Sequence, residues 1–273
     1  MSEKKFILNA DDFGISKELN KAVLKGHLNG FLTSTSICAN GRAFDSAVYE
    51  IIPECPNLGI GVHLNIIEGN GLSDGEKFTK SWGELLLLSN NKNFLDRVEN
   101  EFRLQIEKVL KFAKVTHIDS HVHVHAIPKY FEITCKLAKE YGIKQVRSQY
   151  ENFYVTPDIK KHLTMKYPPN LLKIGILNYF SKHNKEIAKK YGLNTNDYII
   201  GVGYTGLMDE KTVYSGLTSL PEEDMVVEAL IHPHFYPFPE KNNQHFKEYL
   251  ITQNKDLQDK IHRLGFKICN YKD

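Results

Sequence analysis

Thr116-His117-Ile118-Asp119-Ser120-His121-Val122-His123-Val124-His125 is a run in which ligand-bearing side chains alternate with mostly apolar ones. In an extended strand, alternate side chains point to opposite faces, so one face would carry four imidazoles and a carboxylate. Each buried imidazole needs a polar partner, and a metal ion can be that partner. We therefore predict a strand with a metal site on one face. The alternative is a histidine-rich edge strand without function.

The composition sets the limits for the rest of the chain. With 273 residues and 41% apolar content, the chain can bury a large core, and α/β barrels of this length commonly form one domain. We expect a single domain over residues 1–273. The net charge of +2 is small against 35 basic and 33 acidic residues, so we expect neither nucleic acid nor a membrane surface as a partner.

Cysteine usage and the first residues predict the compartment. The four cysteines are far apart and form no C-x-x-C pair, which disfavours a thiolate zinc site and a disulfide framework. The apolar run Phe6-Ile7-Leu8 is too short for a signal peptide, and no apolar segment approaches the length of a membrane span. We expect a soluble, cytoplasmic protein. A homodimer remains an open alternative to a monomer.

Short strand-like runs alternate with helical patterns along the chain. The predicted strands cover residues 5–10, 32–38, 58–65, 116–125, 144–147, 198–202, 226–231 and 266–268. The predicted helices between them cover residues 16–29, 43–50, 81–114 and 128–142. Such alternation predicts parallel strands, and we favour an irregular (β/α) TIM-like barrel over a doubly wound sheet. Residues 148–196 interrupt the alternation and are interpreted as an insertion or lid.

Polar side chains lie at or just after the carboxyl ends of several predicted strands. They are Asp11, Asp12, His63, His121, Arg147 and His232. A barrel brings these strand ends to one rim, where α/β proteins bind their ligands. Adjacent aspartates on a regular strand would face opposite ways, so both reach one site only if the chain turns there. Gly14 makes such a turn feasible.

Four motifs carry a family resemblance. They are Asn9-Ala10-Asp11-Asp12-Phe13-Gly14, Gly61-Val62-His63, the run from Thr116 to His125, and His232-Pro233. Together they resemble the YdjC family of carbohydrate deacetylases, which includes chitooligosaccharide deacetylase. The resemblance implies an irregular barrel, a divalent metal ion and hydrolysis of the N-acetyl group of an amino sugar or oligosaccharide.

The resemblance also assigns roles by position. Asp12, His63 and His121 would be the metal ligands, with Asp11 as catalytic base. His232 matches the family's late histidine. Magnesium and zinc are the first candidates for the metal, and manganese or cobalt also suit such a mixed ligand set.

The chemistry of amide hydrolysis agrees with these roles. A hydrolase acting on a linear amide needs an activated water, a Lewis acid on the carbonyl and a proton for the departing amine. A single metal ion supplies the first two. Asp11 would accept the proton of the water, and a protonated His232 would donate one to the leaving nitrogen.

Other polar residues are candidates for supporting roles. Asp119 either orients a metal-binding histidine or is a buried structural carboxylate. Arg147, His125 and His234 are candidate substrate-binding residues, and Arg147 could instead pair with a carboxylate of the site.

Two other functions fit parts of the sequence. A metal-dependent phosphoesterase on a barrel would bind two or three metal ions and would use His123 and His125 as further ligands. A non-catalytic carbohydrate-binding protein would keep aromatic platforms but has no need for adjacent Asp11 and Asp12. The identity and length of the sugar do not follow from the sequence.

Overall fold

A curled, parallel β-sheet forms the centre of the computed structural model, which describes residues 3–157, 159–165, 167–236 and 242–272. The strand order is β5-β4-β3-β2-β1-β7-β6, and β8 pairs with β1 outside this path. The strands are β1 Lys4–Phe13, β2 Ser34–Ile37, β3 Gly59–Leu64, β4 Val115–Ser120, β5 Gln145–Val146, β6 Tyr198–Ile200, β7 Met225–Ile231 and β8 Phe266–Ile268. The predicted α/β fold with an irregular TIM-like barrel is confirmed.

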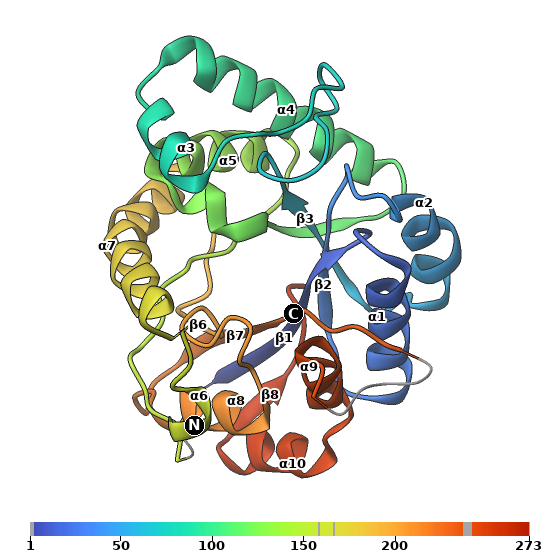
Figure 1. The fold of residues 1–273 in the computed structure, drawn as a ribbon, viewed down its shortest axis with the longest axis vertical. Coiled ribbons are helices and arrows are strands. Elements are labelled where there is room, and N and C mark those ends of the chain that lie inside the picture. Colours follow the sequence, from blue (N-terminus) through green and yellow to red (C-terminus); the bar gives the residue numbers. More distant parts are fainter. Residues whose placement is uncertain (1–2, 158, 166, 237–241, 273) are drawn as a thin grey trace.

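Helices cover the outer side of this sheet (Figure 1). They are α1 Lys17–Asn29, α2 Phe44–Ser46, α3 Trp82–Leu88, α4 Lys92–Leu110, α5 Pro128–Glu140, α6 Ile159–His162, α7 Tyr167–Tyr191, α8 Glu210–Thr218, α9 Gln244–Gln253 and α10 Lys255–Arg263. Side-chain oxygens cap several of them; Ser16, for example, accepts the amide hydrogen of Leu19 at the start of α1. The helical region predicted over residues 81–114 consists of two helices, because the chain turns at residues 89–91.

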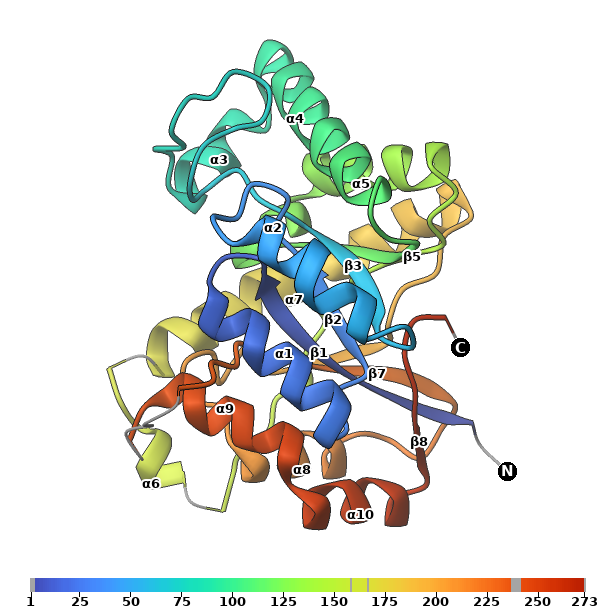
Figure 2. The ribbon, with the colours of Figure 1, turned by 90° about the vertical axis from the view of Figure 1, so that its right-hand side faces the viewer.

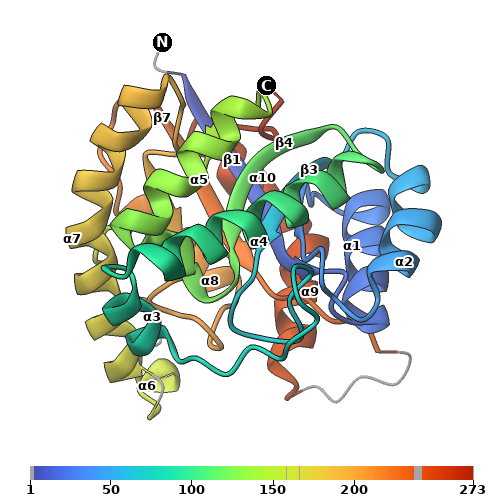
Figure 3. The same cartoon turned by 90° about the horizontal axis from the view of Figure 1, so that it is seen from above.

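The two ends of the barrel differ. The start of β1 and the segment after β8 lie together at one end, and α3 and α6 lie at the opposite end (Figures 2 and 3). Since all pairings of β1 are parallel, this opposite end is the rim at which the strands finish. The predicted functional residues therefore share one rim.

Alternate side chains of β1 face either the hydrophobic core or a buried polar region inside the barrel. Phe6 and Leu8 pack in the main hydrophobic core, whereas Asn9 and Asp11 make polar contacts with Ser36 of β2 and with Arg147, just after β5. Because β1 and the end of β5 are far apart in the strand order, this contact requires the polar face to be concave. The sheet thus encloses a row of buried polar groups.

The histidine-rich run is only partly a strand, which corrects the prediction. β4 ends at Ser120, and His121–Ala126 form a 3-10 turn. Val122 (φ 50°) and His123 (φ 56°) have left-handed backbone conformations, so the two-residue alternation stops there. The interpretation that His121, His123 and His125 follow His117 and Asp119 on one face is therefore wrong.

Residues 148–196 contain α6 and the long helix α7. The amide of Asn184 in α7 donates to the carbonyl of Ala126 at 2.8 Å, and α7 also contacts α5. Leu177 and Ala188 of α7 are buried. The role of this segment as an insertion or lid stays a prediction. Among the residues that the structure describes, no helix combines the length and apolarity that crossing a membrane requires.

Candidate metal centre

A backbone turn at Asp12 separates the two adjacent aspartates. Asp12 has φ 67°, in the left-handed region, and the register between β1 and β2 shifts between Ala10 and Phe13. Aspartate tolerates this conformation better than most residues other than glycine. The turn that we expected at Gly14 (φ +88°) therefore begins two residues earlier. It lets Asp11 and Asp12 reach neighbouring positions on the same rim.

Asp12 contacts His63 of β3 and His121, the first residue after β4. Its Oδ1 atom lies 2.7 Å from His121 Nδ1 and 3.2 Å from His63 Nε2. The potential ligand atoms of the three residues all lie within 4.8 Å of one another. Burial alone would raise the pKa of the Asp12 carboxyl, but hydrogen bonds from His121 and His63 hold it well below its usual value. Asp12 is thus a carboxylate facing two imidazoles.

This donor set fits a divalent metal ion. One carboxylate and two imidazoles are common protein ligands of zinc and related metals, and they leave positions open for water or substrate. His63 and Asp119 also meet a second requirement, because metal-binding histidines usually donate their other ring hydrogen to a carboxylate. His63 Nδ1 donates to Asp119 Oδ1 at 2.8 Å, which directs Nε2 toward Asp12. The structure therefore brings together the three predicted ligands.

Asp119 is buried among donors. It accepts a hydrogen bond from Ser36 Oγ at 2.6 Å and pairs with Arg147 Nη2 at 2.5 Å. Burial opposes its ionisation, but the charge of Arg147 and the contact with His63 hold its pKa below the usual value. Of the two sequence alternatives for Asp119, this contact with His63 matches the orienting role.

Arg147 pairs with carboxylates inside the barrel. Its side chain has no exposed surface, and it donates to Asp11 at 2.8 and 2.6 Å and also to Glu228. Burial disfavours the charge of Arg147, but the surrounding carboxylates raise its pKa above the usual value. Burial likewise raises the pKa of Glu228 to about 7, against the influence of Arg147. The geometry thus corresponds to the carboxylate-pairing alternative for Arg147, since a substrate cannot touch a side chain that is fully covered.

Asp11 is held in a fixed orientation. Arg147 contacts both of its oxygens, and Asn9 Nδ2 donates to Oδ1 at 2.7 Å. A carboxylate has about four acceptor positions, so these three contacts leave one on Oδ2. Asp11, His63 and Asp119 form a second group of potential ligands within 4.8 Å, which overlaps the first at His63.

His232 follows β7 and has an acidic partner. Its backbone amide donates to Glu248 Oε2 at 2.6 Å, and its Nδ1 lies 3.6 Å from the same oxygen. Burial would lower the pKa of His232, but Glu248 and Asp12 raise it to about 9. The imidazole is therefore protonated at neutral pH.

The other two predicted histidines are uncharged. Burial lowers the pKa of His125 and of His234 to about 4. His125 has no exposed surface, and its ring nitrogens lie within hydrogen-bond distance of Ser120 Oγ and the carbonyl of Arg147. His234 stacks on His245 with ring centroids 4.4 Å apart. His125 therefore helps to hold the backbone at Arg147 in place. A substrate contact at His234 stays a prediction.

No sequence pattern pointed to Glu68. Its Oε2 lies 3.4 Å from His121 Nε2, the ring nitrogen that faces away from Asp12. Glu68 belongs to the irregular segment 66–80, where no periodic pattern distinguishes one carboxylate from another. Asn65 fixes its backbone by accepting the amide hydrogen of Glu68 at 3.0 Å. Only the fold therefore identifies this contact.

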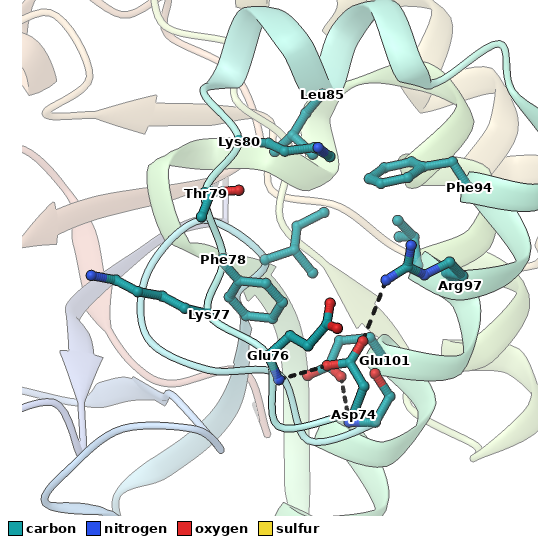
Figure 4. A pocket seen from close by; sticks show the side chains of 13 residues that line it. Asp74, Glu76, Lys77, Phe78, Thr79, Lys80, Leu85, Phe94, Arg97 and Glu101 are labelled. Carbon is teal, nitrogen blue, oxygen red and sulfur yellow. Dashed lines mark hydrogen bonds and ion pairs between the residues drawn. The ribbon is translucent and has the colours of Figure 1, made fainter.

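A carboxylate anchors the same segment farther along. Glu101 of α4 accepts the amide hydrogens of Leu72 and Ser73 at 3.0 and 2.9 Å. Figure 4 shows Glu101 in a pocket of about 180 Å³ next to Asp74 and Arg97, whose side chains form an ion pair. Glu101, Asp74 and Arg97 therefore have partners within the protein, and Glu101 holds the segment that carries Glu68.

The protein is thus an α/β-barrel protein with a candidate metal centre. A carboxylate and two imidazoles form this centre at the carboxyl rim of the barrel. The family model described as YdjC-like protein matches residues 5–263. The chain belongs to the YdjC family.

Similar proteins carry related descriptions. A carbohydrate deacetylase of Clostridium beijerinckii is 36% identical over 191 residues, which cover 62% of this chain and 74% of the relative. A chitooligosaccharide deacetylase of Salmonella typhimurium is 33% identical over 147 residues, covering 52% of this chain and 58% of the relative. The matched segment thus spans little more than half of the Salmonella protein.

A solved structure shares the whole fold. It is an Enterococcus faecalis protein whose description names cellobiose-phosphate cleavage, and its TM-score is 0.75 at 23% identity. The match covers 99% of this chain and 98% of that protein. At this identity the similarity supports the fold alone.

Proposed function

We propose that this chain is a metal-dependent hydrolase that removes the N-acetyl group from an acetylated amino sugar or oligosaccharide. The observation that carries the proposal is the cluster of Asp12, His63 and His121 next to an oriented Asp11 and a protonated His232. Membership of the YdjC family and the names of the relatives give the substrate class. We further propose one divalent ion per chain and a single domain with an inserted segment at 148–196.

The metal would be held by Asp12, His63 Nε2 and His121 Nδ1. When bound, such an ion lowers the pKa of a water and polarises the acyl carbonyl. Asp119 would keep the hydrogen of His63 on Nδ1, so that Nε2 would present its lone pair to a bound ion. Glu68 can do the same for His121 by accepting the hydrogen of Nε2.

Asp11 would act as the base. Its free acceptor position on Oδ2 can take a proton from the attacking water, and Arg147 contacts both of its oxygens. The bidentate contact also fixes the plane of the carboxylate, which reduces the entropy lost on reaching the transition state.

His232 would act as the acid. The leaving amine needs a proton as the C–N bond breaks, and Glu248 keeps His232 protonated at neutral pH. The separate environments of Asp11 and His232 thus give one group that accepts a proton and another that donates one.

The alternative function, that of a phosphoesterase that binds several metal ions, has less support. It requires His123 and His125 as ligands, but both are buried after the turn at Val122. Within the described ranges, the groups that could hold a metal ion include neither of them. A non-catalytic sugar-binding protein would not require the paired Asp11 and Arg147.

The test is hydrolysis of N-acetylglucosamine oligomers by the metal-loaded protein. We expect acetate release that a chelator abolishes and that added divalent metal restores. Elemental analysis should find one ion per chain, lost in His63→Ala and His121→Ala. Acetate release that persists in a protein shown to be free of metal, or full metal occupancy in both variants, would contradict the proposal.

A further inference from the structure

The hydroxyl group of Ser36 lies between two parts of the candidate site. Ser36 is a fully buried residue of β2. Its Oγ atom lies 2.6 Å from Asp119 Oδ2 and 3.1 Å from His117 Nε2, both in β4. It also lies 2.9 Å from Nδ2 of Asn9 in β1. Three partners are the most that one hydroxyl group can serve, because it has one hydrogen to donate and two lone pairs.

The chemistry of the three partners fixes the direction of each hydrogen bond. An ionised Asp119 can only accept, so Ser36 donates its hydrogen to this carboxylate. The Nδ2 atom of Asn9 can only donate, so one lone pair of Oγ accepts its hydrogen. The other lone pair faces His117, which must therefore carry a hydrogen on Nε2.

The other contacts of His117 agree with this tautomer. Burial lowers the pKa of the imidazole to about 3, so the ring is neutral, with a hydrogen on one nitrogen only. Thr116 Oγ1 lies 2.9 Å from Nδ1 and can donate to it. The ring also packs directly on the backbone of β3, since a Cβ atom at Gly61 would overlap it. His117 is therefore held in one orientation.

One branch of contacts leads from Ser36 to a proposed metal ligand. Asp119 accepts the hydrogen of His63 Nδ1 on Oδ1, at 2.8 Å. Its other oxygen, Oδ2, contacts Ser36 and Arg147. These contacts set the plane of the carboxylate, and hence the direction in which Oδ1 faces His63. Partners of this kind fix the tautomer and the ring orientation of metal-binding histidines.

A second branch leads to the proposed base. The Nδ2 atom of Asn9 donates one hydrogen to Ser36 Oγ at 2.9 Å and the other to Asp11 Oδ1 at 2.7 Å. Rotation of this amide away from Ser36 would also remove its contact with Asp11. Ser36 is thus connected to the metal ligand through Asp119 and to the base through Asn9.

We propose that Ser36 is a positioning residue that couples the orientation of His63 to that of Asp11. The inference rests on the proposed function and adds a residue that acts on both of its parts. Loss of the hydroxyl group would leave hydrogens of Asn9 and His117 without partners in a buried region, which is unfavourable. Both branches should therefore change together when this one group is removed.

Metal affinity and turnover of Ser36→Ala test the coupling. Partners of metal-binding side chains usually contribute about 10–100-fold to metal affinity, so calorimetry with Zn²⁺ should show binding about tenfold weaker than in the wild type. At saturating metal, kcat for an N-acetylglucosamine oligomer should also fall about tenfold, because Asp11 loses the alignment that Asn9 gives it. KM should stay the same, since Ser36 is fully buried. A change in only one of metal affinity and kcat would contradict the coupling.

Ser34→Ala is the matched control. Ser34 is also a buried serine of β2, and its hydroxyl group donates to the carbonyl of Gly59 at 3.3 Å, outside this cluster. This variant should keep the metal affinity and kcat of the wild type. Ser36→Cys keeps the size of the side chain with a weaker donor, so its values should fall between the wild type and Ser36→Ala, and it replaces Ser36→Ala if that variant does not fold. Equal effects at positions 34 and 36 would show a general loss of packing and overturn the inference.

Proton NMR of the zinc-loaded protein supplies a readout that does not depend on turnover. The Nδ1 hydrogen of His63 should exchange with solvent about tenfold faster in Ser36→Ala than in the wild type or Ser34→Ala, because Asp119 is held less firmly. Unchanged exchange together with unchanged metal affinity would overturn the inference, whatever the activity. If both change but the wild type hydrolyses no acetylated sugar, the proposed function fails, while the action of Ser36 on His63 is supported.

Discussion

Asp11 and Asp12 are adjacent in the chain, but different groups bind their carboxylates. Asp12 faces His63 and His121, and Asp11 faces Arg147. The positive φ of Asp12 is what allows both side chains to approach the same rim. Two identical residues thus have different chemical environments because their partners differ.

Substitution of each aspartate by asparagine should separate these roles. Asp11→Asn removes the base but keeps the size of the side chain, so we expect metal binding to persist and kcat to fall about 10²–10⁴-fold. Asp12→Asn should instead weaken metal affinity. Metal analysis and turnover are measured on both variants. Near-full turnover in Asp11→Asn, or loss of metal from that variant alone, would reverse the assignment.

The protonation of His232 should set the alkaline side of the pH profile. A general acid must be protonated, and the pKa of His232 is raised to about 9, so kcat/KM should fall as the pH rises through that value. His232→Gln should lower the rate and remove this limb.

Glu248→Gln is the matched variant for this profile. It keeps a hydrogen-bonding side chain but removes the charge, so the pKa of His232 should decrease and the alkaline limb should move to lower pH. An unchanged limb in both variants would show that another group is the acid.

At the scale of elements, the turn after β4 is under backbone strain. Val122 and His123 have consecutive positive φ angles without a glycine. Each such residue costs about 1–3 kcal/mol and persists only where surrounding contacts impose it. Here the buried side chains of Val124 and His125 anchor the turn from its far side.

Replacement of Val122 by glycine should stabilise the protein. Relief of about 1–3 kcal/mol of strain exceeds the roughly 0.4–1 kcal/mol that a glycine costs through the unfolded chain. We expect the free energy of unfolding to rise by about 1 kcal/mol in urea denaturation. Val155→Gly serves as the control, since Val155 is similarly exposed and lacks a positive φ. Destabilisation by Val122→Gly that equals that of the control would argue against strain.

At the scale of the whole molecule, a buried polar network joins the two ends of the barrel. Tyr271, after the last strand, donates to Glu228 of β7, and Glu228 accepts from Arg147, which holds Asp11 at the opposite rim. The Tyr271 ring also stacks on His117 with centroids 4.0 Å apart. Tyr271 therefore supports Asp11 through Glu228 and Arg147, from the opposite end of the barrel.

Removal of the Tyr271 hydroxyl should destabilise this network. Tyr271→Phe keeps the stacking on His117 but leaves the buried Oε2 atom of Glu228 without its donor, which costs about 1–3 kcal/mol. Urea denaturation measures this loss, while metal affinity should stay unchanged because the ligands are untouched. Tyr179→Phe, at a 76% exposed position, should have no effect on stability. Equal stability of the two variants would show that the network does not depend on the hydroxyl.

Local sequence determined the order of strands and helices and the residues at the strand ends. The alternation of apolar and polar residues in β1 and the cap at Ser16 depend on neighbours in the chain, so they can be read without the fold. Because parallel strands finish at one rim, the positions of Asp12, His63 and His121 predicted a cluster that the structure shows.

The tertiary structure alone decided the features that depend on contacts between distant residues. The end of β4 at Ser120 and the turn at Val122 arise because packing overrides the two-residue alternation. The burial of Arg147 among three carboxylates and the approach of Glu68 to His121 join segments from different parts of the chain. No local pattern encodes such partners, since they exist only when the sheet has curled.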